Sequence, residues 1–212
     1  MVRHTGRMST RPLSVRTTVR RPPGRPPRYD FDALLDVVVQ VFNERGYEAT
    51  SMEDLSRATG MTKSAFYHHV AGKEQLLGLA VNRALDGLAL VLEEPAASRG
   101  RPVERLEHVL RRTVQVLVAE LPYVTLLLRL RGNTDAEREA LSRRRELDGR
   151  VAALVAEAAA AGEIRSDVDP RLATRLLFGM VNSTTEWYRP DRGDGLEEAV
   201  VALALDALRG RR

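Results

Sequence analysis

The sequence predicts an all-α protein of about nine helices, divided into a small N-terminal domain and a larger C-terminal domain. Apolar residues recur at spacings of three and four, the pattern of an amphipathic helix, and no segment shows the two-residue alternation of a strand. Only 5% of the 212 residues are aromatic, and Ala, Leu, Val, Arg and Glu dominate, which favours helices over sheets. Caps, glycines and prolines separate the apolar stretches at helical intervals.

The composition also narrows the functional classes. The chain has no cysteine and only four histidines, so thiol chemistry is excluded and we expect neither a metal nor a cofactor. We find no Ser-His-Asp arrangement and no phosphate-binding loop, and therefore expect no enzyme. No apolar run approaches the roughly 20 residues that span a bilayer, and no apolar segment follows the basic N-terminus. We expect a cytoplasmic protein with no membrane partner.

Charge is unevenly distributed along the chain. Residues 1–29 hold eight arginines and no acidic residue, whereas residues 30–75 hold eight acidic and four basic residues. The first segment has few large apolar groups, so burial would not offset the entropy lost on ordering it. We therefore expect residues 1–28 to be a disordered basic arm that reaches a polyanionic partner.

The first helix is predicted over residues 31–45. Its apolar positions fall on one face: Phe31, Leu34, Leu35, Val38, Val41 and Phe42. Asp30 and Asp32 suit its N-terminal end, and Gly46 suits its C-terminal cap.

A second, short helix follows. Thr50 with Glu53 fits a capping box that opens it, and Ser51 with Asp54 fits a weaker one. Gly60 then supplies a tight turn.

A third helix starts after Thr62 and ends near residue 69. At about 100° per residue, Phe66 and Val70 lie on one side, and Ser64 and His68 lie roughly opposite. Large apolar groups therefore face inward and small or polar groups face outward. This is the pattern of a helix-turn-helix, whose second helix approaches base edges in the major groove.

Glycine and proline breaks set the remaining helices. We expect a loop over residues 94–102 and helices at about 73–92, 103–120, 122–130, 134–161, 170–188 and 196–208. Thr134 with Glu137 fits another capping box, and Asp169 followed by Pro170 fits a helix start.

The stretch from about residue 31 to residue 77 resembles the DNA-binding domain of the TetR/AcrR family. The matching motifs follow one another without a gap: Gly46-Tyr47, Ala49-Thr50-Ser51, Asp54-Leu55, Gly60-Met61-Thr62, Phe66-Tyr67-His68-His69-Val70 and Lys73-Glu74-Gln75-Leu76-Leu77. The resemblance implies a helix-turn-helix DNA-binding domain over residues 29–75 and a helical effector-binding and dimerisation domain over residues 76–212. It also implies a ligand-responsive repressor that a small-molecule effector releases from a palindromic operator in double-stranded DNA.

The family's DNA contacts carry over position by position. The resemblance implies that four residues face base edges: Lys63, Ser64, Ala65 and His68. It implies that six residues hold phosphates: Thr50, Ser51, Thr62, Tyr67, His69 and Lys73. Hydroxyls and N–H groups at helix starts suit anions, and Lys73 gains nothing from the dipole at its helix start, so a phosphate is its natural partner. Adjacent histidines point about 100° apart, which disfavours a metal chelate and leaves DNA contact or a solvated surface.

The basic arm contains a pattern of its own. Gly24-Arg25-Pro26 is similar to the core of an AT-hook, which lays arginine into the narrow minor groove. On this interpretation Arg25 and Arg28 enter the groove, although Pro23 stands where the hook has arginine. Loose electrostatic attraction and an inert tail are the alternatives.

The last two long helices carry more apolar surface than a single stripe, which predicts a partner surface. The resemblance implies a four-helix bundle across the two-fold axis of a homodimer. We place four residues in that interface: Leu176, Met180, Val200 and Leu203.

The effector pocket is less well defined. Six residues are candidates for its lining, although core packing explains each equally well: Tyr123, Leu126, Leu127, Arg129, Phe178 and Asn182. Arg129 or Arg131 would meet an acidic group of the ligand, unless both are surface arginines. The segments 167–170 and 187–190 look like a subgroup of regulators of lipid, steroid or aromatic-acid catabolism, so the expected effector is a lipid, an acyl-CoA or an aromatic acid.

Two further points bear on function. Arg143, Arg144 and Arg145 lie near Glu139 and Glu146, so we expect a solvated helix face with ion pairs. The main rival function is an architectural DNA-binding protein that uses the basic arm, which predicts weak sequence preference and a steep salt dependence.

Overall fold

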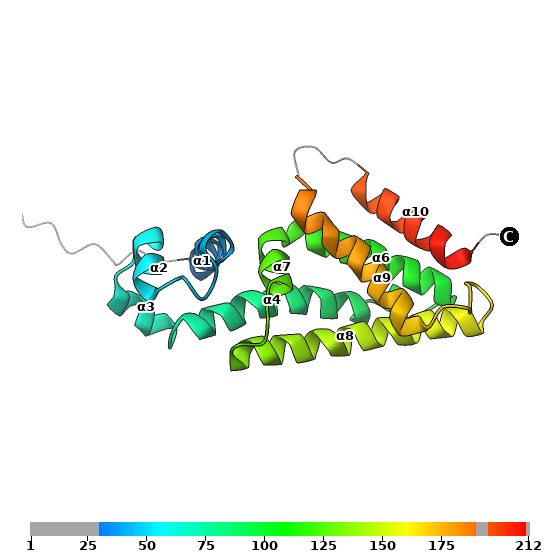
Figure 1. The fold of residues 1–212 in the computed structure, drawn as a ribbon, viewed down its shortest axis with the longest axis horizontal. Coiled ribbons are helices and arrows are strands. Elements are labelled where there is room, and N and C mark those ends of the chain that lie inside the picture. The colour runs from blue at the N-terminus through cyan, green and yellow to red at the C-terminus, as the bar shows by residue number, and fades with distance from the viewer. Residues whose placement is uncertain (1–29, 190–194, 211–212) are drawn as a thin grey trace, which may run out of the picture.

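The structure, a computed structural model, describes residues 30–189 and 195–210, and this part of the chain contains ten helices and no strand (Figure 1). Their bounds are α1 (Phe31–Arg45), α2 (Met52–Thr59), α3 (Lys63–His69), α4 (Lys73–Glu93), α5 (Pro95–Ser98), α6 (Pro102–Ala119), α7 (Leu121–Leu128), α8 (Asp135–Ala160), α9 (Pro170–Trp187) and α10 (Leu196–Arg209). The all-α prediction is confirmed. The additional helix is α5, a single turn that starts with a proline inside the predicted loop.

Local hydrogen bonds fix the starts of the first helices. Asp30 caps α1, where its side chain accepts a hydrogen bond from the N–H of Asp32 at 3.1 Å. Thr62 caps α3 in the same way, accepting from the N–H of Ala65 at 3.2 Å. Gly60 ends α2 with φ at +70°, a left-handed conformation that glycine adopts without steric cost. Capping residues therefore place the turn between α2 and α3 as the sequence predicted.

The start of α2 differs from the prediction by one residue. Ser51, not Thr50, is the cap, and the capping box is formed by Ser51 with Asp54. The Thr50–Glu53 box is wrong because the Thr50 side chain is buried and its hydroxyl donates to the carbonyl of Gly46 at 2.7 Å. Thr50 closes the end of α1 instead of opening α2.

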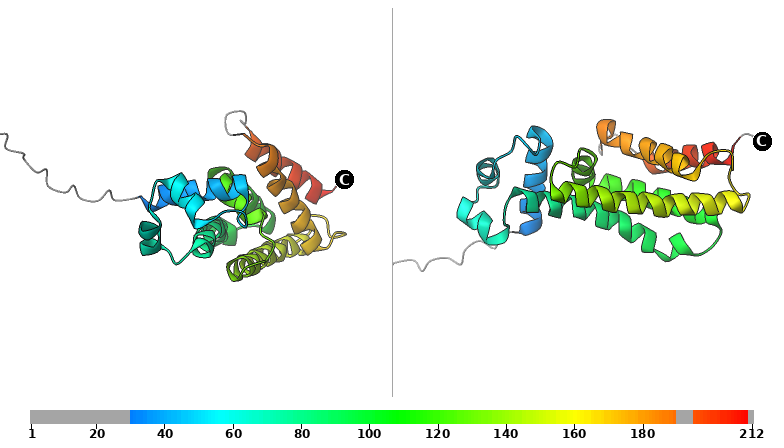
Figure 2. Two further views of the ribbon diagram at one scale, coloured as in Figure 1. Left: turned by 60° about the vertical axis from the view of Figure 1, so that its left-hand side comes forward. Right: turned by 60° about the horizontal axis from the view of Figure 1, so that its bottom comes forward.

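Helix α4 connects the two parts of the fold. It starts beside α3 and runs into the C-terminal domain, where α6, α7 and α8 pack against it (Figures 1 and 2). It is also the one described helix long and apolar enough to cross a membrane by length and composition, with a mean hydropathy of 1.4. Its apolar side chains account for this property within the fold, because Leu76, Leu77, Ala80 and Val81 are fully buried in the core.

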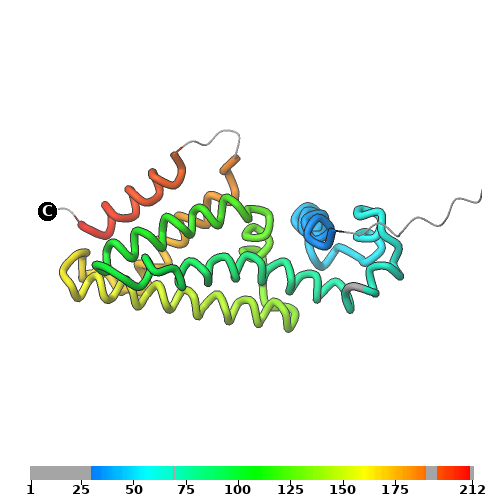
Figure 3. The backbone as a smooth tube through the Cα atoms, turned by 180° about the vertical axis from the view of Figure 1, so that it is seen from behind, coloured from blue at the N-terminus to red at the C-terminus, as the bar shows by residue number. Residues whose placement is uncertain are grey.

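The core consists of two apolar clusters. The larger one continues from the N-terminal helices into the C-terminal domain, since Phe42, Leu77 and Leu127 of α1, α4 and α7 all belong to it. The second fills the far end of the molecule, where α10 covers α6 and α9 (Figure 3). The N-terminal helices are thus joined to the rest through a continuous apolar core as well as through α4.

Candidate functional site

Helix α3 presents polar side chains outward from a buried anchor. Phe66 and Val70 are 1% and 3% exposed and belong to the larger core cluster. Lys63, Ser64 and His68 are exposed on the opposite side. The inward and outward faces deduced from the helical angle are confirmed. Ala65, the fourth residue expected to face bases, is half-buried and packs against the core.

Hydroxyl groups surround this face at the helix starts. Ser51 and Thr62 are exposed caps of α2 and α3, and the Tyr67 side chain is 55% exposed. The Ser51 hydroxyl donates to the carboxylate of Asp54 at 2.6 Å. Hydrogen bonds from the side chain and backbone of Ser51 lower the pKa of Asp54 and keep it ionised. The Ser51 hydroxyl is thus engaged by a carboxylate, whereas the exposed hydroxyls of Thr62 and Tyr67 can donate to a neighbouring phosphate.

Thr50 lies differently from the other residues expected to hold phosphates. Its side chain is 2% exposed, and its hydroxyl proton is used by the carbonyl of Gly46. The expected side-chain contact with phosphate conflicts with this burial. Thr50 instead fixes the loop in which Ser51 stands.

Lys73 also has partners that the sequence did not indicate. Its ammonium donates to the carbonyl oxygens of Tyr47, Glu48 and Thr50 at 3.0, 3.3 and 3.1 Å. It also lies 4.5 Å from the centroid of the Tyr47 ring. Burial, together with the negative charge of Glu74 and Glu48, raises the pKa of Tyr47 to about 12, so this ring stays neutral. Lys73 therefore ties the start of α4 to the loop between α1 and α2.

Some of the predicted DNA contacts cannot be placed. Arg25 and Arg28, and the whole arm over residues 1–28, lie outside the described residues, as does the side chain of His69.

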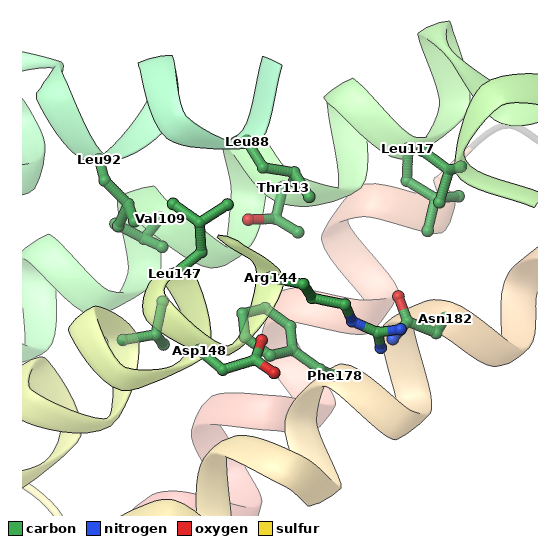
Figure 4. A pocket seen from close by; sticks show the side chains of 12 residues that line it. Leu88, Leu92, Val109, Thr113, Leu117, Arg144, Leu147, Asp148, Phe178 and Asn182 are labelled. Carbon is green, nitrogen blue, oxygen red and sulfur yellow. The ribbon is translucent and has the colours of Figure 1, made fainter. Parts of the chain in front are cut away.

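An apolar cavity of about 50 Å³ lies inside the C-terminal domain (Figure 4). It is enclosed by α4, α6, α8 and α9, with one residue from α7. The lining is mainly aliphatic and consists of Leu88, Leu92, Val109, Thr113, Leu117, Val124, Arg144, Leu147, Asp148, Val151, Phe178 and Asn182. A largely apolar cavity with a few convergent polar groups is typical of a small-molecule site. We name it the effector cavity.

Polar groups enter the effector cavity mainly from α8. Arg144 and Asp148 are one helical turn apart, and in Figure 4 the Arg144 side chain extends toward Asn182. Burial raises the pKa of Asp148, and the positive charges of Arg144 and Arg175 only partly oppose this shift. The cavity therefore contains one cationic group and one carboxyl group that holds its proton more tightly than usual.

The sequence identified only part of this lining. Phe178 and Asn182 line the cavity as expected. Tyr123, Leu126 and Leu127 do not, because they are buried in the core around α1 and α7. Arg129 lies outside it and donates to the carbonyl of Asn43 at 2.6 Å.

The three arginines of α8 have separate environments, so the solvated face predicted for them is wrong in part. Arg143 pairs with Asp86 and Asn82 of α4, Arg144 lines the cavity, and only Arg145 is fully on the surface. The helix packs against α4, α6 and α9, and these neighbours, rather than the local spacing of charges, decide where each arginine points.

A polar network joins the two domains beside the cavity. The Tyr123 hydroxyl donates to Asp36 of α1 at 2.5 Å and accepts from Arg83 of α4 at 3.2 Å. Arg83 also pairs with Glu120 at 2.8 Å and lies over the Tyr123 ring. Burial, followed by the hydrogen bond with Asp36, raises the pKa of Tyr123, so its hydroxyl remains a donor. Tyr123 is therefore a junction residue rather than a cavity residue.

The surface of α9 and α10 carries exposed apolar side chains. Leu176 and Leu203 are 64% and 63% exposed, as an interface requires, and Leu172 is 49% exposed. Met180 is half-buried. Val200 is 5% exposed within a single chain, so its assignment to the dimer interface is wrong: it faces inward from α10 into the core.

Comparisons with known proteins agree with this architecture. Residues 34–80 match the family described as "Bacterial regulatory proteins, tetR family". Residues 99–209, more than half of the chain, match the family described as "Tetracyclin repressor-like, C-terminal domain". The first match covers the helix-turn-helix, and the second covers the lining of the effector cavity except for Leu88 and Leu92 of α4.

Individual relatives give the same result over nearly the whole chain. SCO3833, a TetR-family regulator of Streptomyces coelicolor A3, is 60% identical, with a TM-score of 0.78 over 84% of this chain and 91% of that chain. AibR, solved in complex with isovaleryl coenzyme A and operator DNA, is 26% identical, with a TM-score of 0.72 over 84% of this chain and 97% of that chain. The transcriptional repressor KstR2 of Rhodococcus jostii is 28% identical over 187 residues, which cover 82% of this chain and 89% of KstR2. The helix-turn-helix, the C-terminal helices and these matches together show that the chain belongs to the TetR family of bacterial transcriptional regulators.

Proposed function

We propose that this regulator is a ligand-responsive repressor, which binds a palindromic operator in double-stranded DNA as a homodimer and leaves it when a small-molecule effector binds. The observation that carries the proposal is the outer face of α3, where Lys63, Ser64 and His68 stand exposed on a helix anchored by Phe66 and Val70. A short, fixed helix with small and polar outward groups can approach base edges in the major groove. KstR2 is named a repressor, and AibR was solved on operator DNA.

The contacts divide into reading and positioning groups. Lys63, Ser64, Ala65 and His68 read bases. Ser51, Thr62, Tyr67 and His69 hold phosphates, and Arg25 and Arg28 of the basic arm add minor-groove or electrostatic contacts. Thr50 acts through the loop that it fixes. Lys73 fixes the same loop. It can hold a phosphate only by giving up one of its hydrogen bonds to the main-chain carbonyls.

Dimerisation brings two copies of α3 to one face of the DNA. Leu176 and Leu203 form the centre of the interface, because they are the most exposed large apolar side chains of α9 and α10, and Met180 packs at its edge. Burying such a patch against a second copy removes apolar area from water. The paired α3 helices would then stand roughly 34–36 Å apart, one turn of B-DNA.

The effector occupies the cavity between α4, α6, α8 and α9, and a lipid, an acyl-CoA and an aromatic acid are the candidate classes. Leu88 and Leu92 of α4 line the cavity, and Lys73 at the start of the same helix holds the loop before α2. A ligand that shifts α4 therefore displaces the helix-turn-helix. The protein would act in the cytoplasm, with the DNA that it regulates.

Selection of bound duplexes from a random-sequence pool tests the DNA proposal. We expect a palindrome with two half-sites centred about one helical turn apart. His68→Ala should change the selected bases, whereas Tyr67→Phe should weaken binding to all duplexes alike, since it removes a positioning contact. A pool that yields no preferred sequence, with a steep loss of affinity in salt, would favour the architectural rival and reject the repressor.

A further inference from the structure

The effector cavity opens toward a polar groove, and the two share a boundary. The groove has a volume of about 800 Å³ and lies beside the C-terminal half of α9. Arg144 and Asn182 line both the groove and the cavity. A ligand that fills both spaces would therefore pass between these two side chains. We name this second space the outer groove.

The boundary residues have unused hydrogen-bonding capacity. Among residues 30–189 and 195–210, neither the Arg144 guanidinium nor the Asn182 side-chain amide has a hydrogen-bond or ion-pair partner. A guanidinium offers five N–H donors in a planar fork, which an acceptor on a ligand can use. Figure 4 shows both side chains turned toward each other at one end of the cavity. The boundary is thus arranged to receive an acceptor such as a carbonyl or an acid oxygen.

Asp148 determines which acceptor fits. It stands one turn from Arg144 on α8 and lines the same cavity (Figure 4). A free carboxylate at the boundary would meet a second carboxyl group, which disfavours it. A neutral carbonyl, as in a thioester or an amide, avoids this repulsion. A thioester or amide therefore suits the boundary better than a free acid.

The size of the cavity limits the apolar part of the ligand. A cavity of about 150 Å³ lined by aliphatic and aromatic side chains holds benzene, whereas the effector cavity measures about 50 Å³. In proportion it holds about two carbon atoms as it stands, and a chain of about five carbon atoms requires its lining side chains to move apart. A sterol or a long acyl chain does not fit without a larger rearrangement.

The outer groove favours a polyanion. Arg129, Arg144 and Arg189 line it, together with the hydroxyl of Thr185, and Glu186 is the one acidic side chain among its lining residues. Arginine forks bind phosphate oxygens in pairs. Three guanidinium groups around a space of this size suit a ligand that has phosphates at one end and an apolar group at the other. The phosphates would lie in the outer groove, and the apolar end would lie in the effector cavity.

We propose that the effector is a coenzyme A thioester of a short-chain acid. The acyl chain fills the effector cavity, the thioester carbonyl accepts from Arg144 and Asn182, and the phosphates lie against Arg129 and Arg189. This inference rests on the proposed function, since it names the chemical class of the effector assumed there. AibR, which was solved with isovaleryl coenzyme A, shows that a related fold holds a ligand of this class.

Titration of the full chain with four probes tests the proposal: isovaleryl-CoA, free coenzyme A, isovalerate and palmitoyl-CoA. Calorimetry gives the affinities, and the single tryptophan of the chain, Trp187, provides a fluorescence signal because it is exposed next to Glu186 of the outer groove. We expect isovaleryl-CoA to bind most tightly. Free coenzyme A should bind at least about tenfold more weakly, and isovalerate more weakly still, because each lacks one half of the interaction.

Two neighbouring arginines supply a matched pair of variants. Arg144→Met should weaken isovaleryl-CoA about 10- to 100-fold, the range expected for losing a charge-assisted hydrogen bond. Arg145→Met removes the same charge from an exposed position on the same helix and should change the affinity less than about threefold. Circular dichroism of both variants confirms that they fold.

Each contrary result rejects a specific step. Equal effects of the two variants would show general attraction of an anion and overturn the Arg144 assignment. Isovalerate binding as tightly as its thioester would exclude a role for the outer groove, and tighter binding of palmitoyl-CoA would overturn the size argument. Operator binding is measured in parallel: a chain that binds operator DNA but none of the probes keeps the proposed function and loses this inference.

Discussion

Helix α3 and the effector cavity both combine polar side chains with an apolar anchor or wall, but they hold the polar groups in different ways. In α3, the cap at Thr62 and the anchors Phe66 and Val70 lie within the same nine-residue segment that carries the exposed face. In the cavity, Arg144 and Asn182 come from α8 and α9, and the apolar walls come from five helices, α4, α6, α7, α8 and α9. The DNA face is thus a local structure, whereas the effector site is a tertiary one.

This difference has consequences for mutation. A substitution on the outer face of α3 removes no buried area, so it should alter binding and leave stability nearly unchanged. A substitution in the cavity changes both, because the same side chains pack the core and contact the ligand. The junction at Lys73 belongs to neither class: it is half-buried, and it connects the long helix of the cavity to the loop before the recognition helices.

Removing the buried side chain that anchors α3 should have the largest effect of the changes considered, on both stability and DNA binding. Phe66 is 1% exposed, and truncating a buried phenylalanine costs about 3–5 kcal/mol of folding free energy. We expect Phe66→Ala to lower the free energy of unfolding by this amount in urea denaturation and to abolish DNA binding. Tyr67→Phe, at the next position, is the control and should stay within about 0.5 kcal/mol of the parent. A Phe66→Ala protein that keeps its stability would show that α3 is not held by its own anchor.

The two lysines of the chain, Lys63 and Lys73, offer the next largest contrast. Lys73→Met removes three hydrogen bonds from a charged donor to main-chain carbonyls and should cost about 1.5–3 kcal/mol of stability in the absence of DNA. Lys63→Met removes an exposed ion pair with Glu53 at 3.5 Å and should cost at most about 1 kcal/mol. Thermal unfolding without DNA separates the roles, because a lysine that only bound phosphate would leave stability unchanged.

The local character of the N-terminal domain explains why the sequence predicted it well. Asp30 and Thr62 were identifiable as caps because the side chain of such a residue bonds an N–H two or three positions ahead. The error among the caps, Thr50 for Ser51, arose because two capping patterns were offset by one residue and burial of Thr50 decided between them.

The effector site was predicted less well because its geometry depends on distant segments. Arg144 was grouped with Arg143 and Arg145 on a solvated face, and nothing in their spacing distinguishes the one that lines a cavity from the one that pairs with Asp86 of α4. Glu137 shows the same limit. It was expected to complete a capping box, but its buried carboxylate accepts from the N–H groups of residues 131, 132 and 133. Burial alone would raise the pKa of Glu137, and these three donors lower it.

The smallest expected effect concerns Asp148. It tests whether this polar side chain of the cavity lowers the stability of the fold. Burial raises the pKa of Asp148 in the folded chain above its unfolded value, so the folded state binds that proton more tightly than the unfolded state does. The ionised carboxylate therefore destabilises the fold at neutral pH, and this cost disappears as the pH falls below the unfolded pKa of about 3.9.

Asp148→Asn cannot ionise, so the variant should be more stable than the parent at pH 7 and should approach it near pH 4. The gain should be about 1 kcal/mol or less, a rise of at most about 2–4 °C in Tm for a chain of this size, because the carboxyl group is only partly buried. Glu146→Gln, which removes an exposed carboxylate two residues earlier on α8, is the matched control and should show little change in Tm at either pH. Calorimetric scans of the three proteins across this pH range provide the measurement. If Asp148→Asn is less stable than the parent at pH 7, the carboxylate stabilises the fold through Arg144 and Arg175. The cavity would then resemble the helix ends of the DNA-binding domain, where each charged side chain is hydrogen-bonded to a neighbouring group.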